Sequence, residues 1–133
     1  MSVLMALLLM QAGQTNIPLA FPPAFHGVWD ADAEACSGGH SDMRIKIDAN
    51  GIGYWESEGK PVEIFTAGEN DILVALAMLG EEQKWRSHTR FVLDRSGERM
   101  FAEAIPQAGE DYFKTIWFYQ RCPDGTPMGW GSE

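Results

Sequence analysis

A chain of 133 residues is long enough for one domain and too short for two. Apolar residues make up 45% of the sequence, with five Trp and seven Phe, which excludes a disordered chain and supplies material for a core. The net charge of −9 at pH 7 repels phosphate groups, so we expect no nucleic acid and no anionic lipid surface among the partners.

An apolar run from Val3 to Met10 opens the chain. A membrane-spanning helix needs about 20 residues, whereas the core of a signal peptide needs about 7–15. We therefore expect residues 1–20 to be a signal peptide, with no stable membrane span and with export to the periplasm or beyond. A cytosolic protein with an apolar N-terminal strand is the alternative, because no basic residue precedes the run.

A proline-rich spacer follows, and its prolines restrict the backbone to extended or turn shapes. We therefore place the start of the folded domain near Phe25 and its end at Cys122. The last residues, 123–133, contain two Pro and three Gly and are expected to form a loose tail apart from Trp130.

Between these limits the sequence alternates strand and turn patterns. The alternation of apolar and polar residues is clearest from Met43 to Asp48 and from Trp85 to Leu93, and it indicates half-buried strands. With the shorter segments this gives about eight strands at 8–12-residue spacing, which predicts an all-β antiparallel barrel. The expected strands are 25–30, 43–48, 52–57, 61–66, 72–79, 85–93, 99–104 and 112–121.

Local signals add detail to this pattern. Asn50-Gly51 is a strong hairpin signal, and Glu58-Gly59 predicts the next turn. Residues 72–79 are apolar on both faces, which predicts a buried central strand whose Ala75 and Ala77 face the interior. A helical turn is also expected between Asp30 and Cys36.

The two cysteines, Cys36 and Cys122, lie close to the two ends of the expected domain. Two cysteines in an exported domain usually form a disulfide, and this one would tie the first strand region to the last. Two independent free thiols are the alternative. Metal or redox use is disfavoured, because the chain has no Cys-x-x-Cys motif.

Gly27-Val28-Trp29 on the first expected strand, together with Arg121 at the end of the last, resembles the lipocalin and calycin superfamily. In that superfamily the tryptophan closes the barrel floor, and a basic residue from the last strand packs across its ring. The resemblance implies these closure roles for Gly27, Trp29 and Arg121, with a cation–π contact worth roughly 0.5–2 kcal/mol.

Two further resemblances involve the same motif. Small secreted inhibitors of bacterial metalloproteases also begin a compact eight-stranded barrel with Gly-x-Trp. The whole stretch, with a phrase near Phe-x-Gly-x-Trp, Trp-Glu-Ser and Arg-Cys-Pro, is similar to a set of small exported bacterial proteins of uncharacterised activity.

Carboxylates form no active-site signature. Glu56 and Glu58 would share one strand face and could serve acid–base chemistry, but Glu58 is expected at a turn, where charge is simply solvated. Asp30, Asp32 and Glu34 have the spacing of calcium ligands without the glycine of an EF-hand loop, so turn and cap roles are preferred.

Histidines are too scattered in the sequence to indicate a zinc site, which needs three or four convergent ligands. They are His26, His40 and His88, and His88 is expected on the surface between two arginines. We therefore expect no catalytic residue, no metal and no cofactor.

Tryptophans and arginines are the remaining candidates for contacts. Trp55 and Trp85 flank expected turns, so they are the aromatic residues most suited to contact a ligand or partner at an open barrel end. Four arginines are expected either to form a positive stripe on one side of the domain or to pair across strands with Glu56 and Glu63. They are Arg44, Arg86, Arg90 and Arg99.

Together these patterns favour an exported, monomeric, non-enzymatic binding module for a small apolar ligand or a protein partner. The alternative is an inhibitor of an extracytoplasmic hydrolase that uses a loop or the proline-rich arm to block its target. A carrier requires an interior space, whereas an inhibitor requires a solid core and a rigid protruding segment.

Overall fold

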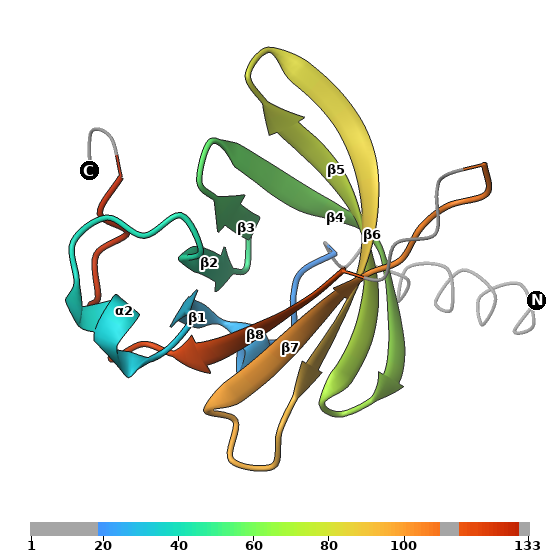
Figure 1. Cartoon of the computed structure of the whole chain (residues 1–133). Helices are drawn as coiled ribbons and strands as arrows, with labels where there is room; N and C mark the ends of the chain where they lie inside the picture. The colour runs from blue at the N-terminus through green and yellow to red at the C-terminus, as the bar shows by residue number, and fades with distance from the viewer. Residues whose placement is uncertain (1–18, 110–114, 131–133) are drawn as a thin grey trace, which may run out of the picture.

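A computed structural model describes residues 19–109 and 115–130 of the chain. In this part, eight strands form a closed antiparallel barrel in which each strand pairs with the next and β8 pairs with β1 (Figure 1). The expected all-β antiparallel barrel is therefore confirmed. The strands are β1 Gly27–Asp30, β2 Ile45–Asp48, β3 Gly51–Tyr54, β4 Ser57–Gly68, β5 Asp71–Gly80, β6 Gln83–Leu93, β7 Arg99–Ala104 and β8 Thr115–Arg121.

Two expectations concern residues outside the described ranges. The proposed signal peptide lies outside these ranges except for its last two positions, 19 and 20. The expected start of the last strand, at 112–114, also lies outside them.

Two short helical segments complete the fold: η1 spans Pro23–Phe25, and α2 spans Ala33–Ser37. The helical turn expected between Asp30 and Cys36 is confirmed by α2, whose N-cap Asp32 accepts a hydrogen bond from the Ala35 amide at 2.7 Å.

The expected turn at Glu58-Gly59 is wrong, because both residues lie inside β4. The chain reverses instead at Trp55-Glu56, and Glu56 adopts the left-handed region with φ 67°. Gly59 lies at a close packing contact and not in a turn: a Cβ there would lie 2.5 Å from the sulfur of Met78 on β5, so the Met78 side chain would have to shift.

The hairpin expected at Asn50-Gly51 forms one residue earlier. Its two turn residues are Ala49 and Asn50, and Asp48 accepts hydrogen bonds from the Asn50 and Gly51 amides at 2.8 and 3.2 Å. Gly51 begins β3 with φ 149°, where a Cβ would lie 2.2 Å from the Gly59 carbonyl oxygen. A glycine is therefore required at this point of strand contact.

The barrel core comes from alternate residues of the strands. On β5, Ile72, Val74, Leu76 and Met78 are buried and belong to the core cluster. Ala75 and Ala77 fall on the opposite face of β5, together with the exposed Leu73 and Leu79. The expectation that they face the barrel interior is therefore wrong, although Ala75 is itself buried. An apolar run gives no indication of which of its two faces turns inward.

Barrel closure brings Gly27, Trp29 and Arg121 together. Trp29 is fully buried and pairs with Arg121 across β1 and β8, and the Arg121 guanidinium carbon lies 4.3 Å from the indole centroid. Arg121 also donates to the carbonyls of Gly97 at 3.0 Å, Ala24 at 2.8 Å and His26. A Cβ on Gly27 would lie 2.7 Å from Arg121 Nη1, so glycine is needed here.

A disulfide joins Cys36, in α2, to Cys122, which directly follows β8. The pairing expected from the sequence is therefore confirmed, across a separation of 86 residues. It holds α2 against the same end of the barrel at which β1 and β8 meet (Figure 1).

Both ends of the described chain pack more tightly than expected. Phe21 is buried in the core and meets Phe91 edge-to-face at 5.6 Å, so packing begins before the expected boundary at Phe25. The tail is not loose over its described part: Met128 is buried, and the Trp130 indole N–H donates to the Ser41 carbonyl at 3.1 Å. Residues 131–133 lie outside the described ranges.

Candidate functional site

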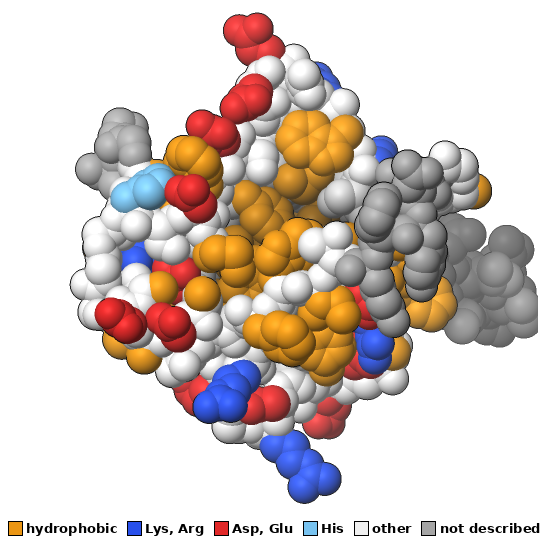
Figure 2. Space-filling view, viewed as in Figure 1, with side chains coloured by type: hydrophobic (Ala, Val, Ile, Leu, Met, Phe, Trp, Pro, Cys, Tyr) orange, Lys and Arg blue, Asp and Glu red, His pale blue; other side chains and the backbone are white. Residues whose placement is uncertain are grey.

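A cavity of about 570 Å³ opens at one side of the barrel. Its walls come from β2 to β8, and hydrophobic surface gathers in a central hollow in Figure 2. Apolar and aromatic side chains supply much of the lining. The aromatic ones are Tyr54, Trp55, Trp85, Trp117 and Tyr119.

Unequal strand lengths leave this space open. β5 accompanies β6 as far as Gln83, but β7 pairs with β6 only over Thr89–Leu93. The amide of Ile105 makes one further contact with the His88 carbonyl at 2.8 Å, and Pro106 then has no N–H to continue the ladder. Over the described residues, the wall is therefore interrupted beside the first half of β6.

Trp55 and Trp85, the two aromatic residues that the sequence suggested as contact residues, lie at the mouth of the cavity. Both line the cavity, and their side chains are 41% and 43% exposed. Trp55 comes from the β3–β4 turn and meets the ring of His40 edge-to-face at 5.2 Å. Two large aromatic surfaces of this kind are suited to contact an apolar molecule entering the cavity.

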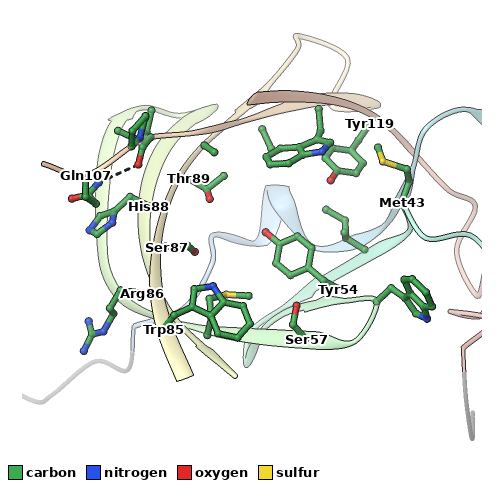
Figure 3. Close-up of a pocket in the computed structure, with 18 of the residues that line it drawn as sticks. Met43, Tyr54, Ser57, Trp85, Arg86, Ser87, His88, Thr89, Gln107 and Tyr119 are labelled. Carbon is green, nitrogen blue, oxygen red and sulfur yellow. Dashed lines mark hydrogen bonds between the residues drawn. The ribbon is translucent and has the colours of Figure 1, made fainter. Parts of the chain in front are cut away.

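Hydroxyl groups lie among the apolar residues of the cavity wall. Figure 3 shows Tyr54 and Tyr119 directed into the same space as Ser87 and Thr89 from β6. Burial raises the pKa of Tyr119 to about 12, with a further contribution from the Asp30 carboxylate. Burial likewise raises the pKa of Tyr54, to which the nearby Tyr119 adds. Both hydroxyls therefore carry their protons at neutral pH.

Carboxylates gather beside the cavity mouth. The turn residue Glu56 lies beside Glu81, from the β5–β6 turn, and Asp42 lines the cavity. Partial desolvation, together with Glu81 and Asp42, raises the pKa of Glu56. His40 pairs with Asp42 at the surface. In Figure 2, acidic side chains run along one side of the hollow from the tip of the β5–β6 hairpin.

His88 is only half exposed, unlike the surface position expected for it. Its Nδ1 atom is buried and has no hydrogen-bond partner in the described part of the chain. Arg86 also lines the cavity, but Figure 3 shows its side chain directed away from the enclosed space.

The expected arginine stripe is wrong, because Arg44 is fully buried. Arg90 donates to Asp71 at 2.9 and 2.7 Å and approaches Glu103 at 3.9 Å, so its ion partners are not the expected Glu56 or Glu63. Arg86 and Arg99 remain exposed. The alternation of apolar and polar residues from Met43 to Asp48 placed Arg44 on the outer face of a strand. In the structure Arg44 precedes β2, and its side chain points inward.

The acidic run near α2 has structural roles. Asp30 is fully buried and accepts a hydrogen bond from Arg44, and Asp32 caps α2. Within the described residues, no group of three or more His, Cys, Asp or Glu side chains is arranged to hold a metal ion. Of the two glutamates expected to share a strand face, Glu58 is exposed on β4. Glu56 lies in the turn before β4, and the carboxyl group near it is that of Glu81.

Comparison of the chain with models of protein families, with curated proteins and with solved structures gives no significant match. Over residues 19–109 and 115–130, no helix has the length and apolar character needed to span a membrane.

Proposed function

We propose that the protein is an exported binding module that takes a small, largely apolar molecule into the cavity beside β6. The main observation in support is a cavity of about 570 Å³ that is lined by aromatic residues, with Trp55 and Trp85 partly exposed at its open end. Ligand sites in proteins usually measure about 300–1,000 Å³ and are lined by apolar residues with a few polar groups. Both properties fit this cavity.

The architecture suits such a role. The disulfide, the Arg121–Trp29 contact and the buried Phe21 and Phe25 fix the barrel away from the cavity. The open side can then remain incompletely packed without loss of the fold. We propose a lipocalin-like relationship on the Gly27-x-Trp29 and Arg121 motif, and export on the disulfide and the apolar leader.

A protein partner is the second candidate, favoured by the outer face of β7 and β8. Phe118 is 71% exposed there, Ile116 is also exposed, and Phe101 meets Phe118 at 6.5 Å between ring centroids. Exposed apolar groups that lie together are typical of interaction surfaces. In the described part of the proline-rich arm, Phe21 and Phe25 are buried, so these two side chains are not free to block a hydrolase.

The test is a fluorescence titration with N-phenyl-1-naphthylamine, an uncharged dye that brightens in apolar sites. We expect saturable binding by the wild-type protein. Ala104→Trp should abolish it, because Ala104 lines the cavity and a larger side chain would fill the space. Ala67→Trp, at an exposed position on β4, is the matched control and should bind normally. Equal binding by both variants would contradict the proposal.

A further inference from the structure

Five hydroxyl groups of the described residues line the cavity, and none has a hydrogen-bond partner in this part of the chain. They belong to Tyr54, Ser57, Ser87, Thr89 and Tyr119. Within residues 19–109 and 115–130, none of these side chains makes a hydrogen bond, and none of the oxygens is shut off from the open space. An apolar occupant would displace water from these hydroxyls and leave them without a partner, which is costly, so an occupant that satisfies these groups would be preferred over a purely apolar one.

The two tyrosines are positioned to act as donors. Tyr54 comes from β3 and Tyr119 from β8, and Figure 3 shows both directed into the cavity. Since their pKa values lie well above neutrality, each keeps a proton to donate. The opposite wall offers Ser87 and Thr89, whose hydroxyls can both donate and accept.

Among the described residues, no Arg or Lys side chain points into the cavity to receive an anionic ligand. The guanidinium of Arg44 is enclosed by Asp30 and backbone carbonyls, and the Arg86 side chain is directed away from the cavity. The mouth carries Asp42, Glu56 and Glu81 on one side. A carboxylate or sulfonate would approach these like charges and lose its hydration without gaining a counterion.

We propose that the ligand is an uncharged ring compound that carries hydroxyl or carbonyl groups, held by the Tyr54 and Tyr119 hydroxyls, and that fatty acids and other organic anions are rejected. This inference rests on the proposed function and deepens it by naming the ligand class. The aromatic wall contacts the ring faces, and the hydroxyls select for polar groups at the ring edge.

The experiment measures displacement of bound N-phenyl-1-naphthylamine by naphthalene, 2-naphthol and 2-naphthoate, which share one ring system. In wild-type protein we expect 2-naphthol to displace the dye at concentrations about fivefold to tenfold below naphthalene, the value of one neutral hydrogen bond. We expect 2-naphthoate to be the weakest. In Tyr54→Phe/Tyr119→Phe the preference for 2-naphthol should fall to about twofold or less, with naphthalene unchanged.

A second arm tests the charged mouth separately. Glu56→Gln/Glu81→Gln removes two rim carboxylates and should raise the affinity for 2-naphthoate while leaving naphthalene binding unchanged. Glu69→Gln/Glu98→Gln changes the charge equally at two exposed turn positions and should have no such effect. A wild-type preference for 2-naphthoate, or an unchanged 2-naphthol preference in the Tyr→Phe variant, would overturn the inference while leaving cavity binding intact. Failure of the dye itself to bind would overturn the proposed function as well.

Discussion

The guanidinium of Arg44 is buried against the carboxylate of Asp30, with Nε 3.0 Å from Oδ2 and both side chains fully inaccessible. The remaining donors of Arg44 point at backbone carbonyls of α2, of the segment after it and of the C-terminal tail. These carbonyls belong to Ala35, Cys36, Gly38, Pro127 and Met128. One side chain therefore organises three segments outside the barrel wall.

Arg44→Met should strongly destabilise the protein, because it leaves the Asp30 carboxylate and several carbonyls buried without a donor. We expect the free energy of unfolding, measured by urea denaturation, to fall by about 3–5 kcal/mol. Arg95→Met, at an exposed turn position, is the control and should change it by less than about 0.5 kcal/mol. Equal effects from the two substitutions would contradict the assigned role of Arg44.

Loss of the disulfide should also cost stability. In the chain-entropy model, closing a loop across the 86-residue separation of Cys36 and Cys122 contributes roughly 4–5 kcal/mol. We expect Cys36→Ser/Cys122→Ser to lower the urea midpoint about as much as reduction of the wild-type protein. The reductant should leave the midpoint of the double variant unchanged. A midpoint of the wild-type protein that is insensitive to reductant would contradict this contribution.

Acid should weaken the pair formed by Asp71 and Arg90. The hydrogen bond from Arg90 holds the pKa of Asp71 below its ordinary value of 3.8. The pair therefore stabilises the fold above pH 3.8, and this contribution disappears as the pH falls through the lower folded-state pKa. Because Arg90 is substantially exposed, we expect less than about 1 kcal/mol.

Urea denaturation of the wild-type protein and of Arg90→Gln between pH 2 and 7 measures the contribution of the Asp71–Arg90 pair to the free energy of unfolding. The two stability curves should differ near neutrality and converge at the acid end. A difference that stays constant with pH would show that Arg90 acts through packing on Phe101, which lies 5.8 Å away, and not through Asp71.

Titration with alkali should reveal the raised pKa of the Tyr119 hydroxyl. Because its folded-state pKa of about 12 exceeds the ordinary value of 10.0, the stability it contributes is present below pH 10.0 and is lost between pH 10.0 and 12. Phenolate absorbance at 295 nm should therefore show a titration near pH 12 in wild-type protein. Tyr119→Phe should lack that component; the loss of a component near pH 10 instead would place the Tyr119 hydroxyl in solvent.

Patterns that act locally in the sequence predicted much of the fold. The alternation of apolar and polar residues identified the strands, because successive side chains of a strand point to opposite faces of the sheet. Gly27, Trp29 and Arg121 could be linked in advance only through the resemblance, and the structure shows them in contact. The Cys36–Cys122 pair was predictable because only two cysteines are present.

Features that depend on distant packing could not be predicted in this way. Gly59 resembles a turn residue, but it lies inside β4, where it packs closely against the sulfur of Met78 on the neighbouring strand. Arg44 resembles an exposed strand residue, yet its partners include a carbonyl 83 positions away. The cavity itself arises from the different lengths of β6 and β7, which no single segment encodes. Only Trp55 and Trp85 indicated its position in advance.

The central claim, that the cavity beside β6 is a ligand site, is tested most directly by NMR of the tryptophan indole N–H groups during titration with N-phenyl-1-naphthylamine. We predict that the signals of Trp55, Trp85 and Trp117, which line the cavity, shift with a common saturating dependence on dye concentration. The signals of Trp29 and Trp130, whose N–H groups bond to the carbonyls of Phe25 and Ser41, should stay in place. Saturable dye binding that leaves the three cavity signals unmoved would contradict the claim and place the bound molecule elsewhere on the protein.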